Sequence, residues 1–195
     1  MDNKDDIFVT RNTLLKLACE SEQKWDEFAK YYYPFIKIIL RHLRIHENDI
    51  EDISQNVMLK LWKNLSKFDS SRGKFRTWLI AIIRNTAKAT QIKQIKDKNR
   101  DYKYLEEHST TINDPLEDIF RREWQKYITN VALENIKSQF SGKAVDVFLL
   151  SLKNLKVEDI ANKLDLKVDS VYKLKNRVKE QLVIEIKRLR TELEH

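Results

Sequence analysis

Apolar residues recur at intervals of three and four between residues 50 and 65, and this spacing predicts an amphipathic helix. The stripe consists of Ile50, Ile53, Val57, Leu61 and Leu65. Asp49, Glu51 and Asp52 lie in the expected first turn, where negative charge suits the helix dipole, and Asn48 or Asp49 is the expected N-cap. We therefore expect a helix with an acidic amino end and one face buried in a core.

Residues that end helices and form turns are scarce along the whole chain. The 195 residues include two glycines and two prolines, whereas proteins usually contain about 7% glycine and about 5% proline. Because strand-rich folds need frequent turn residues, this scarcity favours an all-α fold. Pro34 falls inside an apolar helical pattern over residues 25–43 and is expected to kink or break that helix.

The patterns predict two small helical domains joined by a polar linker. In the first domain, residues 1–95, the expected helices lie near residues 14–19, 25–43, 48–65 and 75–95, with a loop at 68–74. Residues 96–115 are polar, end in turn-forming residues and are the expected linker.

The second expected domain comprises residues 116–192. Its first helix runs from Leu116 to about Ile136 and is followed by a break at Ser141-Gly142. A further helix is expected around residues 145–152. We expect residues 193–195 to be the remnant of an expression tag.

The overall charge indicates the kind of partner. A net charge of +7 and a pI near 9.3 make polyanions the expected partners. Cys19 is the only cysteine, which excludes an intrachain disulfide framework and a cysteine-based zinc site, and we expect it to be a buried thiol. No apolar stretch approaches the roughly 18 residues of a membrane span. The acidic first residues do not resemble a signal peptide, so we expect a cytoplasmic protein without membrane insertion.

A basic, aromatic segment follows the acidic-headed helix. Between Arg72 and Lys96 there are seven lysines and arginines and no acidic residue. The aromatic rings of Phe68, Phe75 and Trp78 are interleaved with these cations. Cations that follow a phosphate backbone, together with rings that stack on unpaired bases, are typical of proteins that bind single-stranded nucleic acid.

Residues 157–178 have the pattern of a helix-turn-helix. Two expected helices, Val157–Leu164 and Val168–Val178, are joined by a short turn that begins at Asp165. Asp165 occupies the turn position usually given to glycine and can adopt a left-handed backbone. The small and apolar contacts between the helices are expected from Ile160, Ala161, Leu164, Leu166, Val171, Leu174 and Val178.

Several of these patterns, in order, resemble region 2 of bacterial RNA polymerase sigma factors, most closely those of the extracytoplasmic-function group. The residues that carry the resemblance are Asp49–Met58, Leu61-Trp62, Phe68-Asp69, Phe75–Leu79 and Arg84-Asn85. The helix-turn-helix is similar to sigma region 4, and no segment resembles region 1.1 or region 3, as expected for this compact group. The resemblance implies a sigma factor that binds core RNA polymerase, recognises the −10 and −35 promoter elements and assists DNA melting without being an enzyme.

The resemblance also implies partners and roles. The polar face of the acidic-headed helix would bind the clamp helices of the largest polymerase subunit, and the flap region of the polymerase is a further contact. Promoter DNA would be bound both as duplex and as single strand, and many members of the group are held by an anti-sigma factor. The polymerase-binding residues implied are Asp49, Asp52, Gln55 and Asn56. Asn56 stands where the family usually has an acid.

Two further sets of residues are implied for DNA. At the −10 element, where a base is flipped out of the non-template strand, they are Phe68, Asp69, Ser70, Ser71, Arg72, Gly73, Lys74, Phe75, Arg76, Arg84, Asn85 and Lys88. At the −35 element they are Lys167, Asp169, Ser170, Tyr172, Lys173, Asn176 and Arg177.

The residues themselves leave some alternatives open. Phe68 and Phe75 either stack on a base or cap the core, and the side chains expected to face the core are Trp78, Leu79, Ile82 and Ile83. His42 and His46 have a spacing that allows a shared metal, but no third ligand is evident, so a solvated pair is favoured. No catalytic motif or cofactor site is evident. The alternative functions are a free-standing helix-turn-helix regulator that binds duplex DNA without polymerase, and an antagonist that keeps the sigma fold but not promoter recognition.

Overall fold

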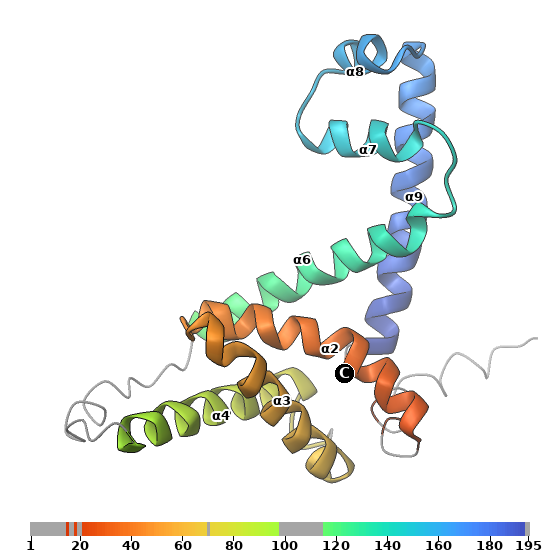
Figure 1. Cartoon of the computed structure of the whole chain (residues 1–195). Coiled ribbons are helices and arrows are strands. Elements are labelled where there is room, and N and C mark those ends of the chain that lie inside the picture. The colour runs from red at the N-terminus through yellow and green to blue at the C-terminus, as the bar shows by residue number, and fades with distance from the viewer. Residues whose placement is uncertain (1–14, 16–17, 19–20, 70, 98–114, 194–195) are drawn as a thin grey trace, which may run out of the picture. The chain divides into compact units, whose positions relative to one another are not determined.

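The computed structural model describes Leu15, Ala18 and residues 21–69, 71–97 and 115–193 (Figure 1). The elements in order are α2 (Glu22–His42), α3 (Glu47–Asn64), the 3-10 helix η2 (Leu65–Lys67), α4 (Phe75–Asp97), α6 (Pro115–Lys137), α7 (Ala144–Leu152), α8 (Val157–Leu164) and α9 (Val168–Leu193). No strand occurs in these described ranges, and the predicted all-α fold is confirmed.

The chain folds into two compact units. One comprises residues 1–125 together with 191–195, and the other comprises residues 126–190. The division falls within α6, between Gln125 and Lys126 and thus beyond the expected linker, and again near the end of α9. The functional domain limits proposed from the sequence stay a prediction. Cys19 and most of the expected linker lie outside the described residues.

The first unit is built on α2, α3 and α4, which pack against one another. All five residues of the predicted α3 stripe are buried, so that part of the pattern is confirmed. α2 contributes Phe28, Tyr32, Phe35, Ile36, Ile39 and Leu40 to the same core, and α4 contributes Phe75, Leu79, Ile80, Ile83 and Ala87. The sequence period thus places the core correctly on α2 and α3 and in part on α4, where Leu79 and Ile83 are buried as expected.

Two local features of these helices differ from expectation. α2 continues through Pro34, which is exposed, so no break occurs there. Buried residues on both sides of Pro34 outweigh the loss of one helical hydrogen bond, which costs about 3 kcal/mol. The N-cap of α3 is His46, whose Nδ1 accepts from the Asn48 amide at 3.4 Å, rather than Asn48 or Asp49.

The amino-terminal part of α6 completes the first unit. Phe120 and Trp124 are buried and meet the ring of Phe35 edge-on, with ring centroids 4.7 and 4.8 Å apart. Trp124 also stacks on Tyr32 at 5.5 Å. The Tyr32 hydroxyl donates to the carbonyl of Leu193 at 2.7 Å, and Leu193 is 2% exposed. Leu193, which was expected to belong to a tag remnant, is therefore part of the packed structure.

The second unit contains the predicted helix-turn-helix. Val147, Ile160, Ala161 and Val171 form its core, where α7, α8 and α9 meet. α8 ends at Asp165, whose φ of 49° is left-handed as expected. The Lys143 ammonium donates to the Leu164 carbonyl and so supplies a partner for the carboxyl end of α8. None of the described helices is both long enough and apolar enough to span a bilayer.

Candidate docking and nucleic-acid surfaces

The polar face of α3 lies opposite its buried stripe. Asp52, Gln55 and Asn56 are exposed on this face, and Asp49 is half-buried at its amino end. These are the side chains expected to bind the polymerase, and α3 presents three of them together to solvent.

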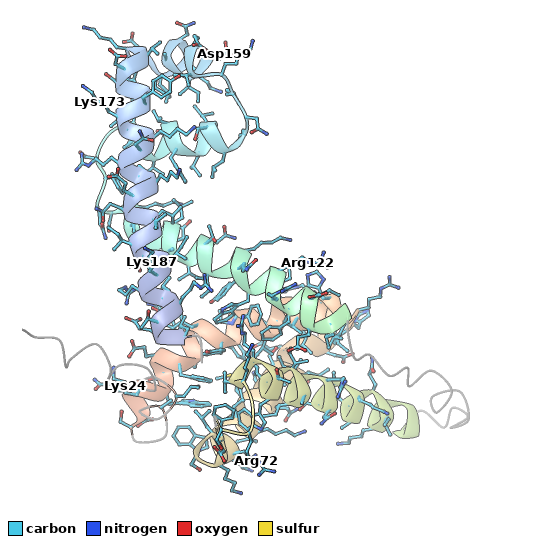
Figure 2. All side chains as sticks on the ribbon, turned by 180° about the vertical axis from the view of Figure 1, so that it is seen from behind. Lys24, Arg72, Arg122, Asp159, Lys173 and Lys187 are labelled. Atoms are coloured by element: carbon cyan, nitrogen blue, oxygen red, sulfur yellow. The ribbon has the colours of Figure 1, made fainter. Side chains whose placement is uncertain are left out.

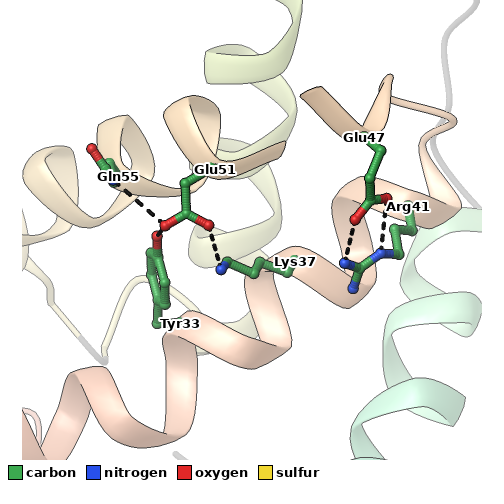
Figure 3. Close-up of polar contacts among 6 residues, drawn as sticks. All are labelled: Tyr33, Lys37, Arg41, Glu47, Glu51 and Gln55. Atoms are coloured by element: carbon green, nitrogen blue, oxygen red, sulfur yellow. Dashed lines mark hydrogen bonds and ion pairs between the residues drawn. The ribbon is translucent and has the colours of Figure 1, made fainter. Parts of the chain in front are cut away.

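The neighbouring acid, Glu51, is engaged within the protein (Figure 3). The Tyr33 hydroxyl and the Lys37 ammonium donate to its two carboxylate oxygens, and the Gln55 amide lies 3.5 Å from one of them. The hydrogen bonds from Lys37 and then Tyr33 lower the pKa of Glu51, while burial and the contact with Glu51 raise the pKa of Tyr33. Glu51 is thus partly neutralised by α2 and is less available to a basic partner than Asp52.

A second contact, the ion pair of Arg41 and Glu47, also joins α2 to α3. The Arg41 guanidinium donates to both carboxylate oxygens of Glu47, at 2.6 and 3.2 Å. The hydrogen bond from Arg41 lowers the pKa of Glu47. Such a two-point contact also fixes the orientation of both side chains. Together with the Glu51 cluster, it sets the amino end of α3 against α2 (Figure 3).

The loop between η2 and α4 has a turn of its own. The Asp69 carboxylate accepts from the amide of Ser71 at 2.9 Å and from its hydroxyl at 2.7 Å. These hydrogen bonds, with the hydroxyl first, lower the pKa of Asp69. The turn leaves Arg72, Gly73 and Lys74 exposed, and Figure 2 shows Arg72 projecting from the loop. Ser70, a predicted DNA-binding residue, lies outside the described residues.

A pocket of about 340 Å³ opens between this loop and α4. Its lining consists of Lys67, Phe68, Asp69, Arg72, Gly73, Lys74, Thr77, Trp78 and Ala81. The predicted loop residues are therefore brought together around a concave site that combines rings with cations. Lys67, Thr77 and Ala81 were not among the predicted DNA-binding residues, because the helical period alone does not distinguish a core face from the wall of a pocket.

Phe75 requires a correction. Its side chain is 1% exposed, and its ring lies between Tyr32 and Phe68, each with its ring centroid 5.4 Å away. A ring enclosed in this way has no free face for a base, so Phe75 caps the core, which is the alternative left open by the sequence. Trp78 differs in the opposite sense: it was expected in the core, but it is half-buried and lines the pocket.

A second pocket, of about 320 Å³, also uses Trp78. It is lined by Lys60, Asn64, Lys67, Trp78, Ile82 and Asn85. The Lys60 ammonium donates to the Thr86 hydroxyl at 3.0 Å, which holds it at the edge of this pocket. Among the other predicted α4 residues, Lys88 is exposed, and Arg76 and Arg84 are half-buried. Ile82, expected in the core, is half-buried here.

The predicted residues of the second unit lie at the start of α9 and in the turn before it. Lys167, Asp169, Tyr172, Lys173, Asn176 and Arg177 are exposed, and Ser170 is half-buried. Figure 2 shows Lys173 on the outside of α9. The Arg177 guanidinium lies 5.5 Å from the centroid of the Phe140 ring, a cation–π distance that restrains this side chain.

The two histidines considered as metal ligands have separate roles. His46 caps α3, and His42 Nε2 lies 3.6 Å from the carboxylate of Glu123. Among the residues that the structure describes, no group of three or more His, Cys, Asp or Glu side chains could hold a metal ion.

The fold and these surfaces define a helical protein with a basic, ring-lined loop in one unit and a helix-turn-helix in the other. Residues 28–96 match the family model of sigma-70 region 2. This match spans most of α2, all of α3, the loop and nearly all of α4. This part of the chain is therefore similar to region 2 of the sigma-70 family.

Among solved structures, CnrH in complex with the cytosolic domain of CnrY is similar to this chain. The sequence identity is 18%, the TM-score is 0.36, and the match covers 92% of this chain and 98% of that one. No curated protein matches the chain at a significant level.

Proposed function

We propose that this chain is a sigma factor of the extracytoplasmic-function group, which binds core RNA polymerase, directs it to promoters and assists DNA opening. The observation that carries the proposal is the loop pocket, because it lies within the matched residues 28–96 and combines cations, small polar groups and rings. The protein would act where the polymerase is, in the cytoplasm, and hydrolyses nothing. An anti-sigma factor stays a prediction.

Docking to the polymerase uses the exposed face of α3. Asp52 provides the negative charge, and Gln55 and Asn56 provide hydrogen bonds to the clamp helices of the largest subunit. Glu51 contributes less, because Tyr33 and Lys37 already occupy its carboxylate. The flap region of the polymerase would meet the second unit.

Capture of a flipped base uses the loop pocket. A base that leaves the duplex must regain a few kcal/mol through stacking and hydrogen bonds. Trp78 and Phe68 supply partly open rings, and the polar groups of Asp69 and Thr77 line the same pocket. Exposed Arg72 and Lys74 lie at its rim, where they can meet the phosphates on either side of the base.

Recognition of the −35 element uses the first turns of α9. A recognition helix inserts its amino-terminal residues into the major groove, where arginine and lysine favour guanine and asparagine favours adenine. Lys173 and Asn176 are exposed in this part of α9, and Arg177 is held near Phe140.

The test is transcription from a fragmented genome library of the source organism, using sigma-free core polymerase with and without this protein. Protein-dependent start sites preceded by two shared motifs are the expected result. Binding to duplex DNA with half-site symmetry, in the absence of polymerase and without new start sites, would favour a free-standing regulator instead. Core binding without any new start site would favour an antagonist.

A pair of arginine variants tests the loop. Arg72→Ala should slow open-complex formation, measured by permanganate reactivity of unpaired thymines, and leave core binding unchanged. Arg122→Ala is the matched control, because Arg122 is also exposed but lies on α6, away from the pocket (Figure 2). Equal loss of DNA opening and core binding in folded Arg72→Ala protein would contradict the role assigned to the loop.

A further inference from the structure

A second cleft opens beside the loop pocket, between the start of α4 and the first turns of α6. It has a volume of about 230 Å³, and its polar lining consists of Lys74, Arg76, Thr77, Glu117, Asp118 and Arg121. All of these residues belong to the first unit. Lys74 and Thr77 also line the loop pocket, so the cleft and the loop pocket share a wall.

The start of α6 is attached to the first unit on both its apolar and its polar side. Phe120 is 1% exposed and meets the ring of Phe35 edge-on, and the buried side chain of Ile80 lines the cleft beside it. On the polar side, the Thr77 hydroxyl donates to the Glu117 carboxylate at 3.0 Å. The carboxylate is thus held against a residue of the loop pocket.

The helix dipole explains why acids occur here, but it does not explain what they face. Negative charge in the first turn of α6 suits the dipole whether the side chains point to solvent or to α4. Asp118 is bound by Arg121 at 2.8 Å, so its charge is partly balanced. The Thr77 hydroxyl is a neutral donor and leaves the charge of Glu117 unbalanced, in a cleft that also holds the Arg76 guanidinium.

This arrangement sets the first turn of α6 in competition with DNA. A strand whose base enters the loop pocket brings its phosphates to Lys74 and Arg76, where two carboxylates of the cleft would repel them. We propose that this turn is an autoinhibitory element, in which Glu117 and Asp118 hold single-stranded DNA away from the loop pocket until the turn is displaced. The inference rests on the proposed function, since it concerns the regulation of the same pocket.

The competition must act in both directions. If the first turn of α6 weakens DNA binding, bound DNA must loosen that turn by the same free energy. Thr77 lies where the two events meet, because it donates to Glu117 and also lines the loop pocket. A bound strand should therefore speed the hydrogen exchange of amides 119–122, which lie just beyond the unbonded first amides of α6.

The test uses the full chain without polymerase and a labelled single-stranded oligonucleotide of mixed sequence, with affinity measured by fluorescence anisotropy. Glu117→Gln should raise the affinity by about two- to fivefold at low salt, the range of exposed charged contacts. The difference should shrink as salt rises. Glu134→Gln is the matched control, because it makes the same change in charge on α6 but lies in the second unit, paired with Lys137. Circular dichroism melting shows whether each variant is folded.

Three results would overturn the autoinhibition. The first is an unchanged affinity of folded Glu117→Gln, including the case in which neither it nor the wild type binds the strand. The second is an equal gain in Glu117→Gln and Glu134→Gln, which would reflect total charge alone. The third is a gain in Glu117→Gln while exchange at amides 119–122 of the wild-type protein does not respond to DNA.

Transcription with core polymerase tests the proposed function separately. Protein-dependent start sites together with an unchanged affinity of Glu117→Gln would leave the function standing and remove the autoinhibition. Absence of start sites together with absence of binding would remove both. A gain confined to Glu117→Gln, with no start sites, would keep the competition between α6 and the strand and reject the sigma function.

Discussion

Asp165 has an unusual backbone conformation for a residue with a side chain. Its φ of 49° lies in the left-handed region, which costs most L-residues about 1–2 kcal/mol and costs glycine little. Two other residues outside glycine, Arg44 and Asn154, share this property in the described chain. In each case a tight turn follows a helix, and the turn is obtained at some expense in stability.

Replacing Asp165 by glycine should stabilise the second unit. Asp165→Gly is expected to raise the free energy of unfolding by up to about 1 kcal/mol, because glycine adopts the left-handed turn without strain. Native-state hydrogen exchange at the amides of α8 and α9 measures this change. Lys163→Gly, placed inside α8, is the control and should lower the same free energy by about 1 kcal/mol. Faster exchange in Asp165→Gly would show that the aspartate itself stabilises the turn.

The Glu51 cluster should be visible in a titration. Hydrogen bonds from Lys37 and Tyr33 lower the pKa of Glu51 below its ordinary value of 4.5. The contribution to stability is therefore complete above pH 4.5 and is lost as the pH falls through the lower pKa of the folded state. Lys37→Met should raise the pKa of Glu51 toward the ordinary value, as measured by carbon-13 NMR of the carboxylate.

A second carboxylate provides the control for that titration. Ser71→Ala removes the hydroxyl that lowers the pKa of Asp69 and should raise that pKa, while Glu51 titrates as in the wild-type protein. If Lys37→Met leaves the titration of Glu51 unchanged, the contact between Lys37 and Glu51 does not persist in solution.

The sequence predicts which side chains of the candidate site are polar and exposed, but it does not predict their internal partners. The exposed positions of Asp52, Gln55 and Asn56 follow from the helical period. The engagement of Glu51 by Tyr33 and Lys37 depends on how α2 crosses α3, which no local pattern specifies. The burial of Phe75 could not be predicted either, because a phenylalanine at the start of a helix suits a core as well as a base-binding surface.

At the level of elements, α4 performs two tasks with adjacent residues. Phe75 and Leu79 pack into the core, whereas Thr77 and Trp78 line the pocket. The two sets are in contact, because the Trp78 ring lies against the buried ring of Phe75, with centroids 5.6 Å apart. Substitutions in this turn of α4 should fall into two kinds: those that destabilise the fold and those that impair DNA opening.

Phe75→Ala is expected to destabilise the fold. Removing a phenylalanine that is almost completely buried should lower the free energy of unfolding by about 3–5 kcal/mol. Urea denaturation followed by tryptophan fluorescence measures this loss, since all four tryptophans lie in the first unit. Phe75→Leu keeps most of the volume and should cost much less. If Phe75→Ala is as stable as the wild type and only DNA opening is impaired, the ring stacks on a base after all.

The predicted helices and the observed ones agree where apolar spacing is strong and differ at their ends. The α3 stripe and the two helices of the helix-turn-helix follow directly from sequence periods. The continuation of α2 through Pro34 and the cap at His46 depend on tertiary packing and on one side-chain acceptor, and both are weak local signals.

For the whole molecule, the net charge of +7 favours association with DNA at both candidate surfaces. The affinity of the complex with core polymerase for promoter DNA should fall with salt, since each neutralised phosphate releases counterions. The slope of log affinity against log salt is negative. Lys74→Gln should make it less steep by about 0.7 on DNA with a single-stranded −10 segment. Lys173→Gln should make the slope less steep by about 0.9 on duplex −35 DNA.

Each lysine variant serves as the control for the other. Lys74→Gln should leave the slope on a duplex −35 fragment unchanged. Lys173→Gln should leave the slope on DNA with a single-stranded −10 segment unchanged. A uniform change in both slopes would mean that these lysines act only through the total charge of the protein.

The sequence predicts two helical parts but not which residues complete each of them. Leu116, Phe120 and Trp124 show a clear helical period, yet nothing in that period indicates that they pack with α2 rather than with the rest of the second part. Contacts between residues far apart in the chain determine which unit each segment belongs to, as the hydrogen bond between Tyr32 and Leu193 illustrates.

The hydrogen bond from Tyr32 to Leu193 has a consequence for anyone who dissects this protein by truncation. The first unit is discontinuous in the chain, so a fragment that stops at residue 97 lacks both the aromatic residues of α6 and the last turn of α9. In such a fragment Tyr32 would lose both the stacked ring of Trp124 and its hydrogen bond to the Leu193 carbonyl, so part of the core of the first unit would become exposed to water. Chimeras that exchange recognition helices between related factors should therefore keep residues 191–193 with the original first unit.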